Sequence, residues 1–215
     1  MFHIVALYTG VLLKGALKDV VLTVVSSILA LILGALGAIG RIYGGPIVGG
    51  AIYWYVEIIR GLPAILQLFI LYFGLSQFGI DLNPLSAAVI WLVAYGTGYA
   101  VEIFRAGIVD VAEGQHEAAK ALGLSRFTTL RKVIIPQAFV SMMPNLTSFL
   151  VLQLKNTTML YLIGYADIMY QARLGADATE QPGPLYLMVA VEYLVISAAI
   201  ARIGSRVERR IAAYR

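Results

Sequence analysis

Five stretches of this chain are long and apolar enough to cross a membrane, which limits its fold more than any other feature. A helical span needs about 20 residues, because the hydrocarbon core is roughly 30 Å thick. Strands of a membrane barrel would be shorter and would alternate in polarity, so helices are indicated. The expected spans are Val20–Ile39, Leu62–Ile80, a third from the Asn83-Pro84 turn to Val101, a fourth from near Pro136 that Pro144 interrupts, and Leu185–Ala201.

The composition agrees with a membrane protein and excludes several other functions. Of the 215 residues, 60% are hydrophobic and 13% are charged, and a soluble domain of this size could not bury so much apolar surface. The chain has no cysteine and its two histidines have no suitably spaced carboxylates, so no metal site is expected. It also lacks the phosphate-binding pattern G-x-x-x-x-G-K-[ST]. We therefore expect an all-α integral membrane protein, one domain over residues 1–215, without catalytic residues.

The distribution of positive charge predicts the topology. If the N-terminus lies outside, the crowded side carries Arg41, Arg60, Arg105, Lys120, Arg126, Arg131, Lys132, Arg202, Arg206, Arg209, Arg210 and Arg215. Lys14, Lys18 and Arg173 then fall on the other side. By the positive-inside rule the crowded side is cytoplasmic, so the C-terminus is expected inside the cell. The segment Ala172–Pro184 then becomes an external loop, in keeping with its Gly, Pro and acidic residues.

A polar insert, Asp110–Pro136, separates the third and fourth spans. A helix is expected to start at Gly114, and Gly123 to end it in the left-handed conformation. Ser125 is expected to cap a second short helix that runs toward a proline stop at Pro136. The alanines leave a thin face that can enter a groove on a partner, with apolar contacts from Leu122, Leu124, Phe127 and Leu130. An ordinary cytoplasmic loop is the alternative that the physics of the insert leaves open.

The insert and its flanks resemble a known family. Glu117-Ala118-Ala119, Gly123 and Ile134-Ile135-Pro136 are similar to the "EAA" loop of ABC-importer permeases, E-A-A-x(3)-G-x(9)-I-x-L-P, with Ile135 where leucine is usual. The segments Glu102–Gly107 and Glu57–Pro63 resemble the branch that imports polar amino acids, which includes permeases for histidine, glutamate, glutamine, arginine and opines. The resemblance extends from about Gly15 to Arg210.

This resemblance implies the type I ABC importer permease fold and a set of partners. The coupling loop would be residues 110–136, and its ATPase-coupling residues would be Glu117, Ala118, Ala119, Leu122, Gly123 and Pro136. No cofactor is expected in this chain, because ATP and Mg would be bound by two separate ATP-binding subunits. A second permease subunit, identical or different, and an external substrate-binding protein would complete the complex. Lipid would surround the spans, and no nucleic-acid partner is expected.

Two ionisable residues fall within expected spans, where a charge costs roughly 2.5–3.5 kcal/mol on insertion scales and is a functional candidate. These are Lys155 and Glu192. The segment around Lys155 resembles the family stretch L-K-D-T-S-L of the translocation path, with Asn156 in place of aspartate. Lys155, Thr157 and Thr158 could bind a substrate carboxylate, and Glu192 its ammonium group. The alternative is that Lys155 and Glu192 pair with each other or reach the membrane interface.

Other candidates carry weaker signals. Tyr99 lies in a segment that loosely matches the family pattern A-Y-x-A-E, although the small residues beside it more often serve helix packing. Glu57 with Arg60, and Glu102 with Arg105, have the i, i+3 spacing of local ion pairs and are expected to be such pairs.

The sequence thus predicts the permease subunit of a bacterial importer in the cytoplasmic membrane. Its cargo would be a polar amino acid: glutamate or aspartate, glutamine and the basic amino acids all stay open, and Asn156 with Lys155 slightly favours an acidic or neutral one. A proton-coupled secondary transporter that uses Glu192 is the first alternative, although such folds usually contain an internal repeat. A membrane scaffold that recruits a soluble partner without transporting anything is the second.

Overall fold

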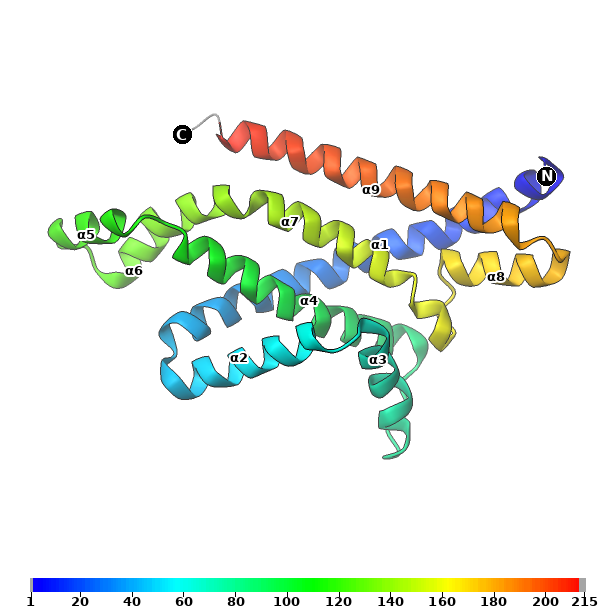
Figure 1. Ribbon diagram of the computed structural model, residues 1–215, viewed down its shortest axis with the longest axis horizontal. Coiled ribbons are helices and arrows are strands. Elements are labelled where there is room, and N and C mark those ends of the chain that lie inside the picture. The colour runs from blue at the N-terminus through cyan, green and yellow to red at the C-terminus, as the bar shows by residue number, and fades with distance from the viewer. Residues whose placement is uncertain (1, 213–215) are drawn as a thin grey trace.

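The computed structural model of the protein describes residues 2–212, and all regular elements within this range are helices (Figure 1). In this part of the chain, 4 helices are long and apolar enough to cross a membrane, and the number rises to 5 if one bent pair counts as a span. The expectation of an all-α membrane protein is therefore confirmed.

The first helix, α1, is longer than the span predicted from the sequence. It runs over Phe2–Tyr43, which is 42 residues, whereas the apolar pattern predicted Val20–Ile39. At about 1.5 Å per residue its length is roughly twice the thickness of a hydrocarbon core. Asp19, which the sequence placed at the boundary of the span, lies inside the helix and is fully buried.

The second predicted span, Leu62–Ile80, is wrong as a single straight helix. Helix α2, Gly45–Gly61, begins earlier, and a second piece formed by α3, Ala64–Phe69, and the π-helical turn η1, Ile70–Gly74, follows it at 109°. Pro63 explains the break, because proline disfavours the helical conformation of the residue before it, and Leu62 is extended. As a result α3 leaves the bundle at a steep angle (Figure 1).

Helices α4, Pro84–Val109, and α7, Ile135–Thr157, form the centre of the bundle with α1. The predicted start of α4 is confirmed: the Asn83 side chain accepts a hydrogen bond from the backbone N–H of Ser86 (2.9 Å). Helix α7 begins where it was predicted, but it continues through Pro144. Small residues let α1 and α4 approach closely, since a Cβ on Gly34 would overlap Ala100.

The predicted external loop Ala172–Pro184 is instead mostly helix. Helix α8 covers Ile168–Thr179, and α9 begins soon after it and covers Pro182–Ala212. The Gly and acidic residues of this segment made it resemble a loop, although its buried residues have the spacing of a helix. Ile168, Ala172 and Ala176 are spaced four residues apart and are all buried in a cluster with residues of α1 and α9.

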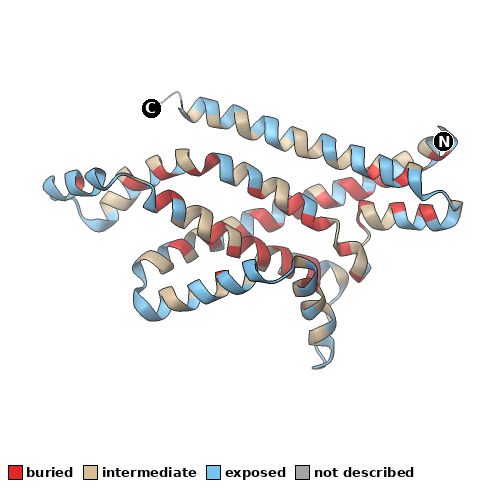
Figure 2. Ribbon diagram, viewed as in Figure 1, coloured by how far each residue is buried: buried red, intermediate tan, exposed pale blue. Residues whose placement is uncertain are grey.

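Buried residues concentrate where α1, α4 and α7 cross, and near the start of α8 (Figure 2). By contrast, α2 and much of α9 expose large apolar side chains, among them Trp54 and Leu194. Such faces suit contact with lipid or with another membrane subunit rather than with water.

Candidate functional site

The polar insert forms two short helices at one end of the bundle (Figure 1). Helix α5 covers Glu113–Ala121, and Gly123 follows it with φ 70°, the left-handed value that was predicted. Helix α6, Arg126–Thr129, starts after Ser125, whose hydroxyl accepts a hydrogen bond from the backbone N–H of Thr128 (3.2 Å). Both predicted landmarks are confirmed, although α5 begins one residue before Gly114.

The predicted stop at Pro136 is wrong. A π-helical turn, η2, covers Leu130–Ile134 and connects α6 to α7 without a break. Pro136 lies in the first turn of α7, directly after this π-helical turn. The amide of Gln137 also donates a hydrogen bond to the Gln115 side chain (3.1 Å), which ties α5 to α7. The insert is therefore joined to α7 by continuous helix and by a side-chain contact.

Large apolar side chains on the insert face outward. Leu122 is 77% exposed and Phe127 is 71% exposed, and Leu124 between them is also exposed. We call these three residues the loop face. Glu117 and Ala118 are exposed as well. Ala119 was expected on the thin face that enters a groove, but it is buried, with only 2% of its surface exposed.

Leu130 also differs from the expectation of a free contact residue. It is half-buried and packs against a cluster that contains Ile108 and Ile134. The exposed apolar surface of the insert is thus smaller than the sequence suggested, because Ala119 is buried and Leu130 is half-buried.

The candidate pathway segment at the other end of α7 does not form one surface. Lys155 is exposed, Asn156 and Thr157 are buried, and Thr158 is half-buried. The Thr157 hydroxyl oxygen lies 3.2 Å from the Tyr193 hydroxyl oxygen of α9. Helical geometry explains the split, because consecutive residues point about 100° apart around a helix.

Lys155 and Glu192 do not pair with each other in the described part of the chain. The ion pairs that residues 2–212 form involve other side chains, so the pairing alternative is wrong. Lys155 instead lines a hollow between α7 and α9 together with Thr147, Ser148 and Val151. Glu192 is half-buried, and its Oε2 atom lacks a hydrogen-bond partner.

Tyr99 belongs to a row of aromatic residues on α4. The Tyr95 hydroxyl donates a hydrogen bond to the Tyr99 hydroxyl (3.1 Å), and the two ring centroids are 4.9 Å apart. Trp91 continues the row at 5.5 Å from Tyr95. Asn156 is buried nearby and has a side-chain nitrogen without a partner. These hydroxyl and amide groups offer neutral polar contacts at the junction of α4 and α7.

A cluster of ion pairs lies where α1, α2 and α4 meet. The sequence predicted only one pair of this cluster, Glu102 with Arg105. Glu102 contacts Arg41 of α1, lies 3.0 Å from Arg105 and 4.0 Å from Arg60 of α2. The local pair of Glu102 and Arg105 is thus confirmed. The expected pair of Glu57 and Arg60 is not formed, because Arg60 points toward Glu102 instead.

Comparisons with known proteins agree on the kind of molecule. Residues 26–213 match the family described as "Binding-protein-dependent transport system inner membrane component". The glutamine transport system permease protein GlnP of Escherichia coli (strain K12) is 32% identical over 93% of this chain and 92% of its own length. The arginine transport system permease protein ArtQ of Bacillus subtilis (strain 168) is 33% identical over the same shares.

Solved structures give the same result for the fold. The crystal structure titled as an amino acid ABC transporter with histidines has a TM-score of 0.93 and 31% identity, and the match covers 98% of both chains. A methionine ABC transporter in an inward-facing conformation has a TM-score of 0.75 over 94% of this chain and 97% of its own. At 20% identity this second likeness shows the fold alone.

The molecule is therefore a multi-pass helical membrane protein with a permease fold, and its role is transport rather than covalent catalysis. The chain belongs to the family of inner membrane components of binding-protein-dependent transport systems.

Proposed function

We propose that this chain is the permease subunit of an ATP-driven importer that carries a polar amino acid across the cytoplasmic membrane. The names of its relatives and their coverage of nearly the whole chain support amino-acid import. Two ATP-binding subunits would bind ATP and Mg, a second permease subunit would complete the pathway, and an external binding protein would deliver the cargo.

The observation that carries this proposal is the loop face on a rigid support. Leu122 and Phe127 expose apolar surface at the tip of a polar insert. Apolar surface that is exposed to water in this way is typical of a site that binds a partner. Because α6, η2 and α7 form one continuous helical path, a partner that binds the loop face can displace α7. Exposed apolar side chains at the ends of short helices, Leu122 after α5 and Phe127 on α6, suit insertion into a groove of a partner.

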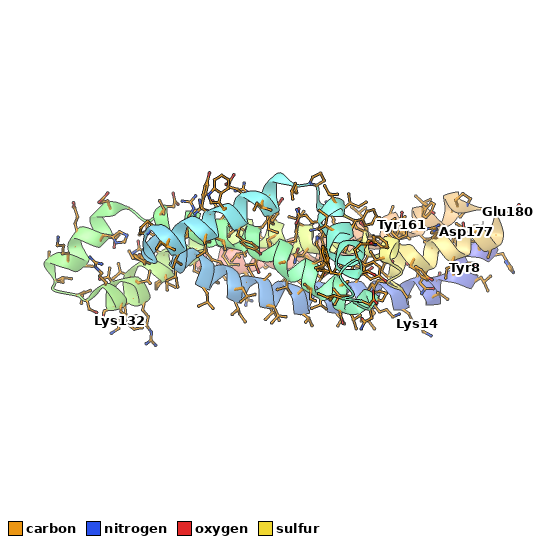
Figure 3. All side chains as sticks on the ribbon, turned by 90° about the horizontal axis from the view of Figure 1, so that it is seen from below. Tyr8, Lys14, Lys132, Tyr161, Asp177 and Glu180 are labelled. Carbon is orange, nitrogen blue, oxygen red and sulfur yellow. The ribbon has the colours of Figure 1, made fainter. Side chains whose placement is uncertain are left out.

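Charge supports the orientation in which the insert is cytoplasmic. Lys132 lies at the α5 end of the molecule, and Lys14 lies toward the opposite end (Figure 3). The end of α9 that carries Arg206, Arg209 and Arg210 also extends toward the α5 end (Figure 1). The positive-inside rule then places α8 and the turn into α9 on the outer side, where the external binding protein would dock.

The proposed transport step is a two-state change. Closure of the ATP-binding subunits would favour one position of α5 and α6, and α7 would carry that displacement to residues 155–158. A ligand shifts such an equilibrium only by its difference in affinity for the two states. Glu117–Gly123 would act as the coupling helix, with Pro136 in the adjoining turn of α7.

The pathway residues fit a zwitterion that is neutral or acidic overall. Lys155 and Glu192 form no ion pair within residues 2–212, so each is available to an opposite charge on the substrate. Asn156 supplies an amide where the resembling family has a carboxylate, which lowers the attraction for a cationic side chain. Thr157, Thr158 and Tyr99 would add hydroxyl contacts.

The test is uptake in proteoliposomes that contain the permease, its ATP-binding subunits and the binding protein. We expect Leu122→Ala with Phe127→Ala to lower ATP-dependent uptake and the amount of ATP-binding subunit that copurifies. His116→Ala, also exposed on α5, is the matched control and should leave both unchanged. Uptake that needs a proton gradient but no ATP would favour the secondary transporter, and a complex that transports no amino acid would favour the scaffold.

A further inference from the structure

A buried carboxylate in α1 is hydrogen-bonded to both α8 and α9. Asp19 is fully buried, and its Oδ2 atom accepts two hydrogen bonds. One comes from the backbone N–H of Ile168 at the start of α8 (3.3 Å), and the other from the hydroxyl of Tyr193 on α9 (3.1 Å). A buried carboxylate is costly unless such bonds compensate for lost hydration. One oxygen atom of α1 thus fixes both α8 and α9.

The contact continues to the candidate pathway segment. The Tyr193 hydroxyl that binds Asp19 also lies 3.2 Å from the hydroxyl oxygen of Thr157, which is fully buried. Thr157 is the last residue of α7 and belongs to residues 155–158. A short series of polar contacts therefore leads from the first N–H of α8 through Asp19 and Tyr193 to the end of α7.

Further contacts prevent the start of α8 from moving independently of α1. A Cβ on Gly15 would lie 2.6 Å from the Cα atom of Ile168, so the two backbones touch. The Lys18 ammonium group donates a hydrogen bond to the carbonyl of Ala166 (3.2 Å). Asp167, which is also fully buried, caps α8 by accepting a hydrogen bond from the N–H of Tyr170 (2.6 Å).

The exposed part of α8 lies at the end of the molecule that is proposed to face outward. Figure 3 places Tyr8 of α1 and Asp177 of α8 at the same end of the molecule, together with Glu180 in the turn before α9. The side chain of Asp177 is largely exposed. A partner that contacts the exposed side of α8 would thus act on a helix whose buried start is hydrogen-bonded to Asp19.

We propose that Asp19 is a positioning residue for transport. By holding the start of α8 and the Tyr193 hydroxyl with one oxygen atom, Asp19 sets the position of Thr157 and passes a displacement of α8 to the end of α7. This role rests on the proposed function, in which α8 faces the external binding protein and the end of α7 borders the substrate pathway. Asp19 does not touch the substrate in this arrangement.

The experiment measures ATP hydrolysis by the complete complex in proteoliposomes, with and without loaded binding protein. We expect Asp19→Ala to lower the stimulation by loaded binding protein about tenfold, a typical coupling between two sites, with unstimulated hydrolysis within about twofold. Asp19→Asn should restore most of the stimulation, because the amide oxygen can accept the same two hydrogen bonds. Tyr193→Phe should lower it, and Tyr186→Phe, an exposed tyrosine on the same helix, should not.

The double variant Asp19→Ala with Tyr193→Phe should be no worse than Asp19→Ala alone, since both changes interrupt one series of contacts. Equal losses of abundance, unstimulated hydrolysis and stimulated hydrolysis in Asp19→Ala would overturn the proposal in favour of packing alone. If that variant does not fold, Tyr193→Phe decides: stimulation equal to that of Tyr186→Phe also overturns it. A wild-type complex without ATP-dependent uptake would instead reject the proposed function.

Discussion

The two ends of α7 are built in opposite ways. At the α5 end, the helix continues into an insert whose apolar side chains are exposed and whose turns are set by Gly123 and Ser125. At the other end, Thr157 is buried in contacts with Tyr193, which in turn binds Asp19. The first end offers a surface to a partner, and the second is fixed to other helices from within. A partner would therefore displace α7 at its exposed α5 end, and the displacement would change contacts at the end that holds Thr157.

The largest effect is expected from a substitution that removes the turn at Gly123, in the insert that precedes α7. Gly123→Pro is incompatible with φ 70° and also deletes the N–H that donates to the Lys120 carbonyl (3.0 Å). We expect ATP-dependent uptake to fall to background, a loss on the order of a hundredfold or more, because the coupling geometry is lost. Gly114→Ala, in open space on the same insert, is the control. Normal uptake by the proline variant would show that this turn does not transmit force.

A smaller effect is expected at the constrained end. Lys155→Ala should lower uptake about tenfold, equivalent to about 1.4 kcal/mol, through loss of a charged contact with the substrate carboxylate. Lys155 is exposed, so membrane abundance should not change. The measurement is initial uptake rate at equal abundance, with Lys14→Ala as the control. An unchanged rate would remove Lys155 from the pathway.

The third prediction concerns stability rather than transport. Gly15→Ala places a methyl group 2.6 Å from the Ile168 backbone, and overpacking of this kind costs about 1–3 kcal/mol. Gly10→Ala, on the same helix but with nothing within 4 Å, should have little effect or a slightly stabilising one. Thermal unfolding of the detergent-solubilised protein compares them. Equal midpoints would contradict the close contact of α1 and α8.

The smallest expected effect is a pH dependence from Asp167. Burial raises the pKa of its carboxyl group to about 8, from a usual value of 3.8. The pKa of Asp167 is higher in the folded state than in the unfolded state. Its contribution to folding stability is therefore fully present below about pH 4, declines above that pH, and is lost once the pH has risen through 8. We expect the unfolding temperature to fall across this window as the pH rises. Asp167→Asn should flatten the profile, and an unchanged slope would exclude Asp167 as its source.

The sequence predicted best what depends on neighbouring residues. Gly123 ends a helix and Ser125 begins one because of their own backbone and hydroxyl chemistry. Apolar length alone was sufficient for the fold class and for the start of α7. These features need no knowledge of how distant segments meet.

The features that the sequence missed depend on contacts between distant segments. Asp19 reads as the end of a span until Ile168 and Tyr193 are placed beside it. Helix α8 was predicted to be a loop because only its few buried residues are spaced as in a helix. Lys155 and Glu192 were a plausible pair by composition, yet α7 and α9 present them separately.

The Glu102 cluster has a consequence for how this bundle tolerates change. Among the ion pairs of residues 2–212, a single negative charge joins positive charges from α1, α2 and α4. Neutralising one arginine leaves the remaining attraction in place. Neutralising Glu102 leaves like charges facing one another, so the same helices would be driven apart. Substitution of Glu102 should therefore disturb the contact of α1, α2 and α4 more than substitution of any one of its three arginine partners.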